Sequence, residues 1–227
     1  MKRIPFFLFV FLLCYTVKSQ NLDHSLYKKF DQIIGVKNTP LSYGAIYLEK
    51  YRVLNKTNHN FLLDNGFQKG NIKYRNQNFY DVDLKYDIVD DFIVVRIKDQ
   101  NQIISIIPEK SLIQNFELHQ LNFKNAGNLG FLEEMVNTDN YSLYKKHQKD
   151  VIENKEKNYL RHQFKKRSDQ YFLFYQNEYY EINSKKDFIR IFPNQKKAIN
   201  HFYKNHVFYL KNDFKSFVVK LMNQLQY

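Results

Sequence analysis

Several acidic residues lie close together in the sequence and suggest a metal site. Asp81, Asp83 and Asp87 alternate along one segment, and Asp90 and Asp91 follow it. Clusters of carboxylates bind calcium, but an EF-hand loop is excluded because Tyr86 stands where that loop needs a glycine. Alternate residues of a strand also lie about 7 Å apart, too far for several of them to share one ion. The favoured interpretation is a charged strand face in water, and a calcium site is the alternative.

Other residue patterns that are typical of metal sites and active sites do not occur in the sequence. The seven histidines contain no pair at the i, i+4 spacing that places two zinc ligands on one helix face. No Gly-x-Ser-x-Gly elbow, phosphate-binding loop or dinucleotide fingerprint occurs, and Gly127 and Gly130 form only a pair of turn glycines. Glu133 and Glu134 are adjacent, so on a strand they point to opposite faces. We therefore predict no catalytic residue, no cofactor and no metal site.

Basic residues are concentrated toward the C-terminal end. Residues 20–140 hold 14 basic and 15 acidic residues, whereas residues 141–227 hold 18 basic and 8 acidic ones. Such a patch attracts nucleic acid, anionic lipid head groups or an acidic protein. The candidate contacts with an anionic partner are Lys185, Lys186, Arg190, Lys196, Lys197 and Lys204. The alternative is an ordinary solvated surface that is rich in lysine because the whole chain is.

The first 19 residues are typical of a secretory signal peptide. Lys2 and Arg3 precede an apolar run over residues 6–15, which is about half as long as a bilayer span. We expect cleavage before Gln20, export to the periplasm, the envelope or the medium, and no transmembrane segment in the mature chain. Cleavage would remove Cys14, the only cysteine, which excludes disulfides and thiolate sites. Export also argues against nucleic acid as a partner.

Residues 43–183 have the pattern of an antiparallel β domain, preceded by a lead-in over residues 20–42 with helical spacing between residues 21 and 34. The clearest strand, residues 79–87, alternates charged residues with Tyr80, Val82, Leu84 and Tyr86. Further strands are expected near residues 72–74 and over residues 92–97, 103–107, 116–123, 131–136, 141–145, 171–175 and 178–182. The charged stretch near residues 150–168 is expected to be a protruding loop or a frayed helix.

Residues 184–227 carry the signals of helices. Ser184 and Asp187 form a capping-box pattern, and Pro193 ends the first short helix and starts the next. Asn212 or Asp213 can cap a last helix with one apolar stripe, made of Phe214, Phe217, Val218, Leu221 and Leu225. Strands followed by helices predict an α+β fold: a curved antiparallel sheet, as a meander or half-barrel, with a small basic helical part packed on it.

Two stretches carry a resemblance to known proteins. They are Tyr80-Asp81-Val82-Asp83-Leu84-Lys85-Tyr86-Asp87, and Tyr179-Tyr180 through Ser184-Lys185-Lys186 to Phe192-Pro193. Together they are similar to exported proteins of Gram-negative bacteria that have no assigned function. The chain departs from that pattern because the turn at Asn177-Glu178 lacks a glycine. The resemblance implies a periplasmic or surface location and transfers no catalytic residue.

These observations predict an exported, non-enzymatic binding or envelope-associated protein. Its basic C-terminal surface would meet an anionic envelope component or an acidic protein, and its oligomeric state is left open. The first alternative is a carrier that holds a small apolar ligand or lipid inside the curved sheet. The second alternative is an envelope hydrolase whose polar residues are dispersed along the chain.

Overall fold

The computed structural model describes residues 35–53, 55, 57–99, 102–157 and 159–225. The expected signal peptide and the expected helix over residues 21–34 lie outside this part of the chain. The described chain begins with two 3₁₀ turns, η2 (Val36–Asn38) and η3 (Pro40–Ser42), and η3 buries Leu41 in the core.

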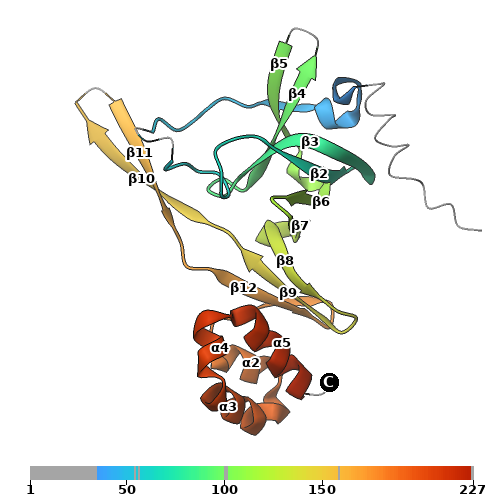
Figure 1. The fold of residues 1–227 in the computed structure, drawn as a ribbon, viewed down its shortest axis with the longest axis vertical. Coiled ribbons are helices and arrows are strands. Elements are labelled where there is room, and N and C mark those ends of the chain that lie inside the picture. Colours follow the sequence, from blue (N-terminus) through green and yellow to red (C-terminus); the bar gives the residue numbers. More distant parts are fainter. Residues whose placement is uncertain (1–34, 54, 56, 100–101, 158, 226–227) are drawn as a thin grey trace, which may run out of the picture.

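An antiparallel sheet of 11 strands forms most of the described protein (Figure 1). Its strands are β1 (Gly44–Ile46), β2 (Gln68–Tyr74), β3 (Gln77–Asp87), β4 (Phe92–Asp99), β5 (Gln102–Pro108), β6 (Ile113–Leu118), β7 (Leu121–Asn125), β8 (Phe131–Asn137), β9 (Tyr141–Lys146), β12 (Gln170–Tyr175) and β13 (Glu178–Glu181). They lie in the order β1-β5-β4-β3-β2-β6-β7-β8-β9-β12-β13. The short 3₁₀ turns η4 (Lys110–Leu112) and η5 (Gly127–Leu129) connect strands. The sheet does not close into a barrel, and helices follow it, so the predicted α+β fold is confirmed.

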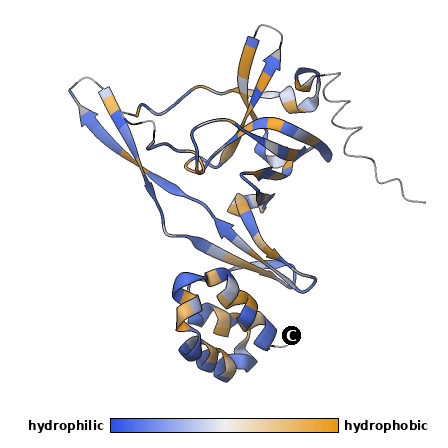
Figure 2. Cartoon of the chain, viewed as in Figure 1, coloured by the Kyte–Doolittle hydropathy of each residue, from blue (hydrophilic) through white to orange (hydrophobic). Residues whose placement is uncertain are grey.

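Side chains of the curved strands β2 to β8 fill the inner face of the sheet. Aromatic rings make the centre of this first core: Phe116 stacks on Phe123 with 4.6 Å between ring centroids, and Tyr86 and Phe131 meet them edge-on. Edge-to-face and offset contacts of this kind stabilise a core beyond the effect of burying the ring area. Figure 2 shows the resulting alternation of hydrophobic and hydrophilic residues along the strands.

Three of the four charged residues of β3 are buried, contrary to the prediction that this face lies in water, and only Asp81 is exposed. Asp83, Lys85 and Asp87 are at most 7% exposed. The chain between β1 and β2 covers Lys85 and Asp87: the Lys85 ammonium lies 3.6 Å from the centroid of the Phe61 ring, and Asn60 Nδ2 donates to Asp87. Alternation in a sequence shows that a strand has two chemically different faces, but it does not show what covers each face.

Tyr80 also departs from the prediction, because it lies on the outer face of the sheet. The register between β2 and β3 shifts between Gly70 and Ile72, and Asp81 has a φ of 53°, in the left-handed region. An extra residue at such a bulge reverses the facing of the residues on one side of it. Phe79, rather than Tyr80, therefore points into the core.

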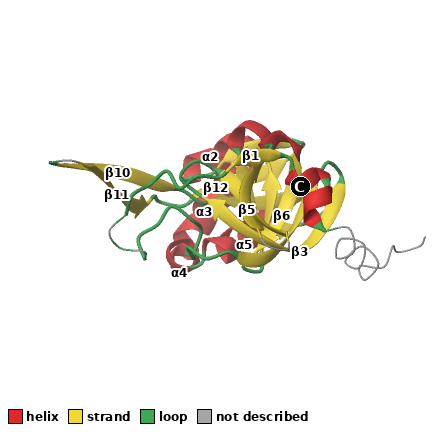
Figure 3. Ribbon diagram, turned by 90° about the horizontal axis from the view of Figure 1, so that it is seen from above, coloured by secondary structure: helices red, strands yellow, loops and turns green. Residues whose placement is uncertain are grey.

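The stretch near residues 150–168 is a two-stranded ribbon instead of the predicted loop or frayed helix. Strands β10 (Lys149–Glu156) and β11 (Tyr159–Lys166) pair in register and protrude from the protein (Figures 1 and 3). Its base is held by Phe164, whose ring meets that of Tyr51 edge-on at 5.2 Å. The backbone of Phe164 also donates to and accepts from the Asn58 side chain.

Four helices follow the sheet in the described chain: α2 (Lys185–Ile191), α3 (Lys196–Asn205), α4 (Val207–Asn212) and α5 (Phe214–Leu225), with the turn η6 (Pro193–Gln195) between the first two. The predicted capping box is present, since Asp187 accepts from the backbone and the hydroxyl of Ser184. Asp213 accepts from Ser216 N at the start of α5, as predicted. These helices cover one face of β9 and β12 and form a second core with them.

No helix among the described residues has the length and apolar character that a bilayer crossing requires.

Candidate functional site

The structure places all six predicted basic contacts on the helical part. Every one of them is exposed: Lys185, Lys186 and Arg190 on α2, and Lys196, Lys197 and Lys204 on α3. Lys197 and Lys204 are seven residues apart, so they lie on the same side of α3. The opposite side of α3 buries Ile199 and Phe202 in the second core.

The helical part, residues 184–225, carries an uncompensated positive charge. It contains nine basic and two acidic residues, a formal net charge of +7. Both acids already cap helices: Asp187 belongs to the capping box and pairs with Arg190 at 3.3 Å, and Asp213 accepts from Ser216 N. Among the described residues, none of the eight lysines of this part forms an ion pair. The field of the lysines therefore extends into the surrounding water.

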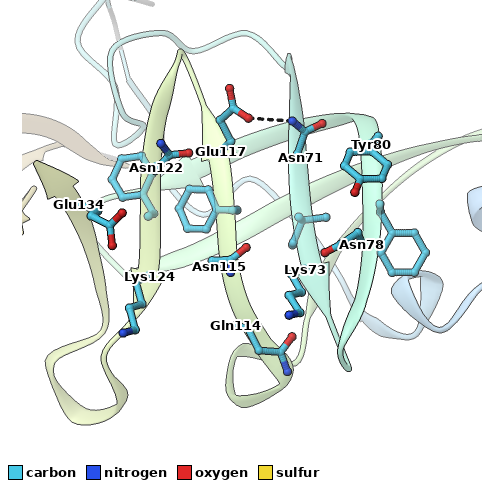
Figure 4. A pocket seen from close by; sticks show the side chains of 14 residues that line it. Asn71, Lys73, Asn78, Tyr80, Gln114, Asn115, Glu117, Asn122, Lys124 and Glu134 are labelled. Atoms are coloured by element: carbon cyan, nitrogen blue, oxygen red, sulfur yellow. Dashed lines mark hydrogen bonds between the residues drawn. The ribbon is translucent and has the colours of Figure 1, made fainter. Parts of the chain in front are cut away.

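A second candidate site lies on the outer face of the sheet, where a pocket of about 460 Å³ spans β2, β3, β6, β7 and β8 (Figure 4). Its polar lining consists of Asn71, Lys73, Asn78, Tyr80, Gln114, Asn115, Glu117, Asn122, Lys124 and Glu134. This site is not among those predicted from the sequence. Its residues come from five strands, and only the register between those strands brings them together. The available signal was a pair of polar residues on either side of an apolar one, as at Asn71 and Lys73 or at Asn122 and Lys124.

The aspartates that were considered as calcium ligands point to different partners. Asp83 binds three cations, with Lys69 at 2.9 Å, Arg96 at 3.1 Å and Lys98 at 3.3 Å. Burial raises the pKa of Asp83, but the hydrogen bonds from these cations outweigh burial, so the pKa lies below its usual value. Asp90 instead pairs with Lys50 at 3.0 Å. In the part of the chain that the structure describes, no three His, Cys, Asp or Glu side chains converge on one point.

Asp91, in the turn before β4, forms a partly buried ionic network with Lys110 of η4 and Lys146 of β9. Its Oδ2 accepts from Lys110 Nζ at 2.7 Å and from Lys146 Nζ at 2.8 Å, and its Oδ1 accepts from Tyr86 OH at 2.6 Å. Gly130 lies directly against this network, because a β-carbon there would overlap both the Asp91 carboxylate and the Lys146 ammonium. Each charge has an opposite partner, so the network has a structural role, and removing one partner would leave the buried Lys146 charge without its counterion.

Glu133 and Glu134 point to opposite faces of β8, as predicted. Glu133 contacts His147 Nε2 at 2.5 Å, and Glu134 accepts from Tyr144 OH at 3.3 Å. His201 and His206 also have separate environments, since His201 contacts the Asn205 amide and His206 stacks on Phe202.

Comparison of the chain with protein families, with curated proteins and with solved structures gave no match.

Proposed function

We propose that this protein is an exported, non-enzymatic, envelope-associated binding protein, and that its basic helical part binds an anionic partner. The charge balance of residues 184–225 carries the proposal, because nine basic residues face two acids and both acids are engaged in helix caps. An anionic envelope surface offers the complementary charge, and each lysine near such a surface contributes about 1 kcal/mol. Binding would be electrostatic, with little directional specificity, and would weaken as salt screens the charges.

A triple charge reversal tests this proposal. The variant Lys186→Glu, Lys197→Glu, Lys204→Glu changes three exposed lysines on α2 and α3. Losing three attractive contacts corresponds to about 3 kcal/mol, so we expect its affinity for vesicles of phosphatidylglycerol to fall at least about a hundredfold. The measurement is co-sedimentation with vesicles at low and at physiological ionic strength, and phosphatidylcholine vesicles provide the uncharged comparison.

The matched control is Lys155→Glu, Lys157→Glu, Lys165→Glu on the protruding ribbon. These lysines are exposed as well, and the control alters the net charge by the same amount. We expect it to retain most of the binding. Equal losses in the two triple variants would mean that net charge alone attracts the vesicles, and unchanged binding in the helical variant would contradict the proposal.

Export is supported by the sequence of residues 1–19, and amino-terminal sequencing of protein from native cells tests it separately. We expect Gln20 to be the first residue. A chain that begins at Met1 or Lys2 and retains Cys14 would contradict export.

No observation favours the carrier alternative, because core side chains occupy the inner face of the curved sheet.

A further inference from the structure

The polar residues of the pocket on the outer face of the sheet lie in two rows, one cationic and one acidic, and this arrangement suggests a ligand. Residues that face each other across neighbouring strands share a face of the sheet, and their side chains form rows. One row runs from Asn78 through Lys73 and Asn115 to Lys124, as the pairings between β3, β2, β6 and β7 show. We call it the cationic row.

The second row lies two residues further along the strands and is acidic. It runs from Asn71 through Glu117 to Asn122, and Glu134 lines the pocket on the next strand. Figure 4 shows Asn71 and Glu117 joined by a hydrogen bond of 2.8 Å, with Lys73 and Lys124 on the opposite side of the pocket. We call this second row, from Asn71 to Glu134, the acidic row.

The ammonium groups and side-chain amides of the cationic row are available to a ligand. Within the described chain, neither Lys73 nor Lys124 forms an ion pair, and the side-chain amides of Asn78 and Asn115 make no hydrogen bond. The same holds for the amide of Asn122 in the acidic row. Lys124 is held in place by aromatic rings, with its Nζ 5.5 Å from the centroid of Phe174 and 6.0 Å from that of Tyr144. Two strand spacings separate Lys73 from Lys124, which places the backbones that carry them about 10 Å apart.

The acidic row offers acceptors. Glu117 accepts from the Asn71 amide, and Glu134 accepts from Tyr144 OH, yet neither carboxylate pairs with a described cation. Each carboxylate has further lone pairs to accept hydroxyl protons. A ligand with many hydroxyl groups would therefore find acceptors on one side of the pocket and cations on the other.

From this arrangement we infer that the pocket binds an acidic oligosaccharide, whose carboxylates contact the cationic row and whose hydroxyls contact the acidic row and the amides. An asparagine side chain has a donor and an acceptor side by side, which matches two neighbouring hydroxyls of a sugar. A nucleic acid fits less well, because its closely spaced phosphates would lie against Glu117 and Glu134. An apolar ligand would leave this polar lining without partners.

Titration with trigalacturonate, followed by calorimetry and by amide chemical shifts, tests this inference. We expect binding that shifts residues of β2, β6 and β7. The variant Lys73→Gln, Lys124→Gln should lower the affinity at least tenfold, whereas Lys155→Gln, Lys165→Gln on the ribbon should leave it unchanged. Cellotriose, which has hydroxyls but no carboxylate, should bind more weakly than trigalacturonate.

The helical triple reversal separates this site from the proposed function. It should retain trigalacturonate binding while it loses vesicle binding. Absence of trigalacturonate binding to the unmodified protein would overturn the inference, and so would equal binding of cellotriose. Chemical shifts confined to other strands, or preferential binding of a short oligothymidylate at the same residues, would also overturn it.

Discussion

Replacing Asp91 by asparagine is expected to lower the free energy of unfolding by about 3 kcal/mol. Asparagine keeps the size of the side chain and tolerates the φ of 57° that Asp91 adopts. The change removes the negative charge that Lys110 and Lys146 contact, and the Lys146 side chain is only 8% exposed. Without the Asp91 carboxylate, the buried Lys146 ammonium keeps its hydrogen bond to Leu129 O but has no countercharge, which accounts for the size of the expected effect.

The same substitution should change how stability depends on pH. Burial raises the pKa of Asp91, but the charge of Lys146 and hydrogen bonds from Lys110, Lys146 and Tyr86 outweigh burial and hold the pKa below its ordinary value. A carboxyl whose pKa is lowered by folding contributes stability above its unfolded pKa, near 4, and loses it as the pH falls through the folded pKa. The difference in free energy of unfolding between the unmodified protein and the Asp91→Asn variant should therefore become smaller as the pH falls below about 4.

Urea denaturation at neutral and acidic pH measures both effects. The control is Asp150→Asn, because Asp150 pairs with Arg167 on the surface, where both side chains are about half exposed. A surface pair of this kind contributes less than about 1 kcal/mol. Equal destabilisation by the two variants, or a gap that does not change with pH, would contradict the structural role of Asp91.

Replacing Phe217 by alanine is expected to destabilise the helical part by about 4 kcal/mol. Phe217 is fully buried in the second core, where its ring lies 4.8 Å from that of Tyr203 and 5.2 Å from that of Phe202. Its removal leaves a cavity between α3 and α5 that these rigid rings cannot fill. Phe208→Ala is the control, because Phe208 lies on α4 of the same helical part but is 71% exposed.

Hydrogen exchange of the backbone amides is the measurement that locates the destabilisation in the Phe217→Ala variant. The first core, inside β2 to β8, and the second core, between the helices and β9 and β12, are built from different residues. We expect amides of α3 and α5 to lose protection in Phe217→Ala while those of β3 and β4 keep it, because local regions can open below the global unfolding energy. An equal loss in both cores would show that they unfold as one unit.

Local signals in the sequence predicted the helical part well. The capping box at Ser184 and Asp187, the break at Pro193 and the apolar stripe of α5 all depend on residues a few positions apart. Such short-range geometry is set by helix caps and by the 3.6-residue period, so it can be read without knowing the rest of the fold.

Turns without a characteristic residue were missed. Residues 116–123 were predicted as one strand, but His119 and Gln120 adopt positive φ values and divide the stretch into the hairpin β6–β7. Glycine and asparagine usually mark such tight turns, and neither stands at these two positions. Pairing along β6 and β7 therefore imposes this backbone conformation against the local preference.

The sequence by itself determined that the chain forms strands first and helices last, and that its positive charge gathers in the helical part. Only the tertiary structure decided that Lys85 and Asp87 of β3 are covered by the chain around Phe61, and that Lys73 and Lys124 flank Asn115 in one row. The physical reason is that helix caps and apolar periodicity act between near neighbours. Burial of a strand face and the order of side chains across a sheet instead depend on which distant segments pack together and in which register.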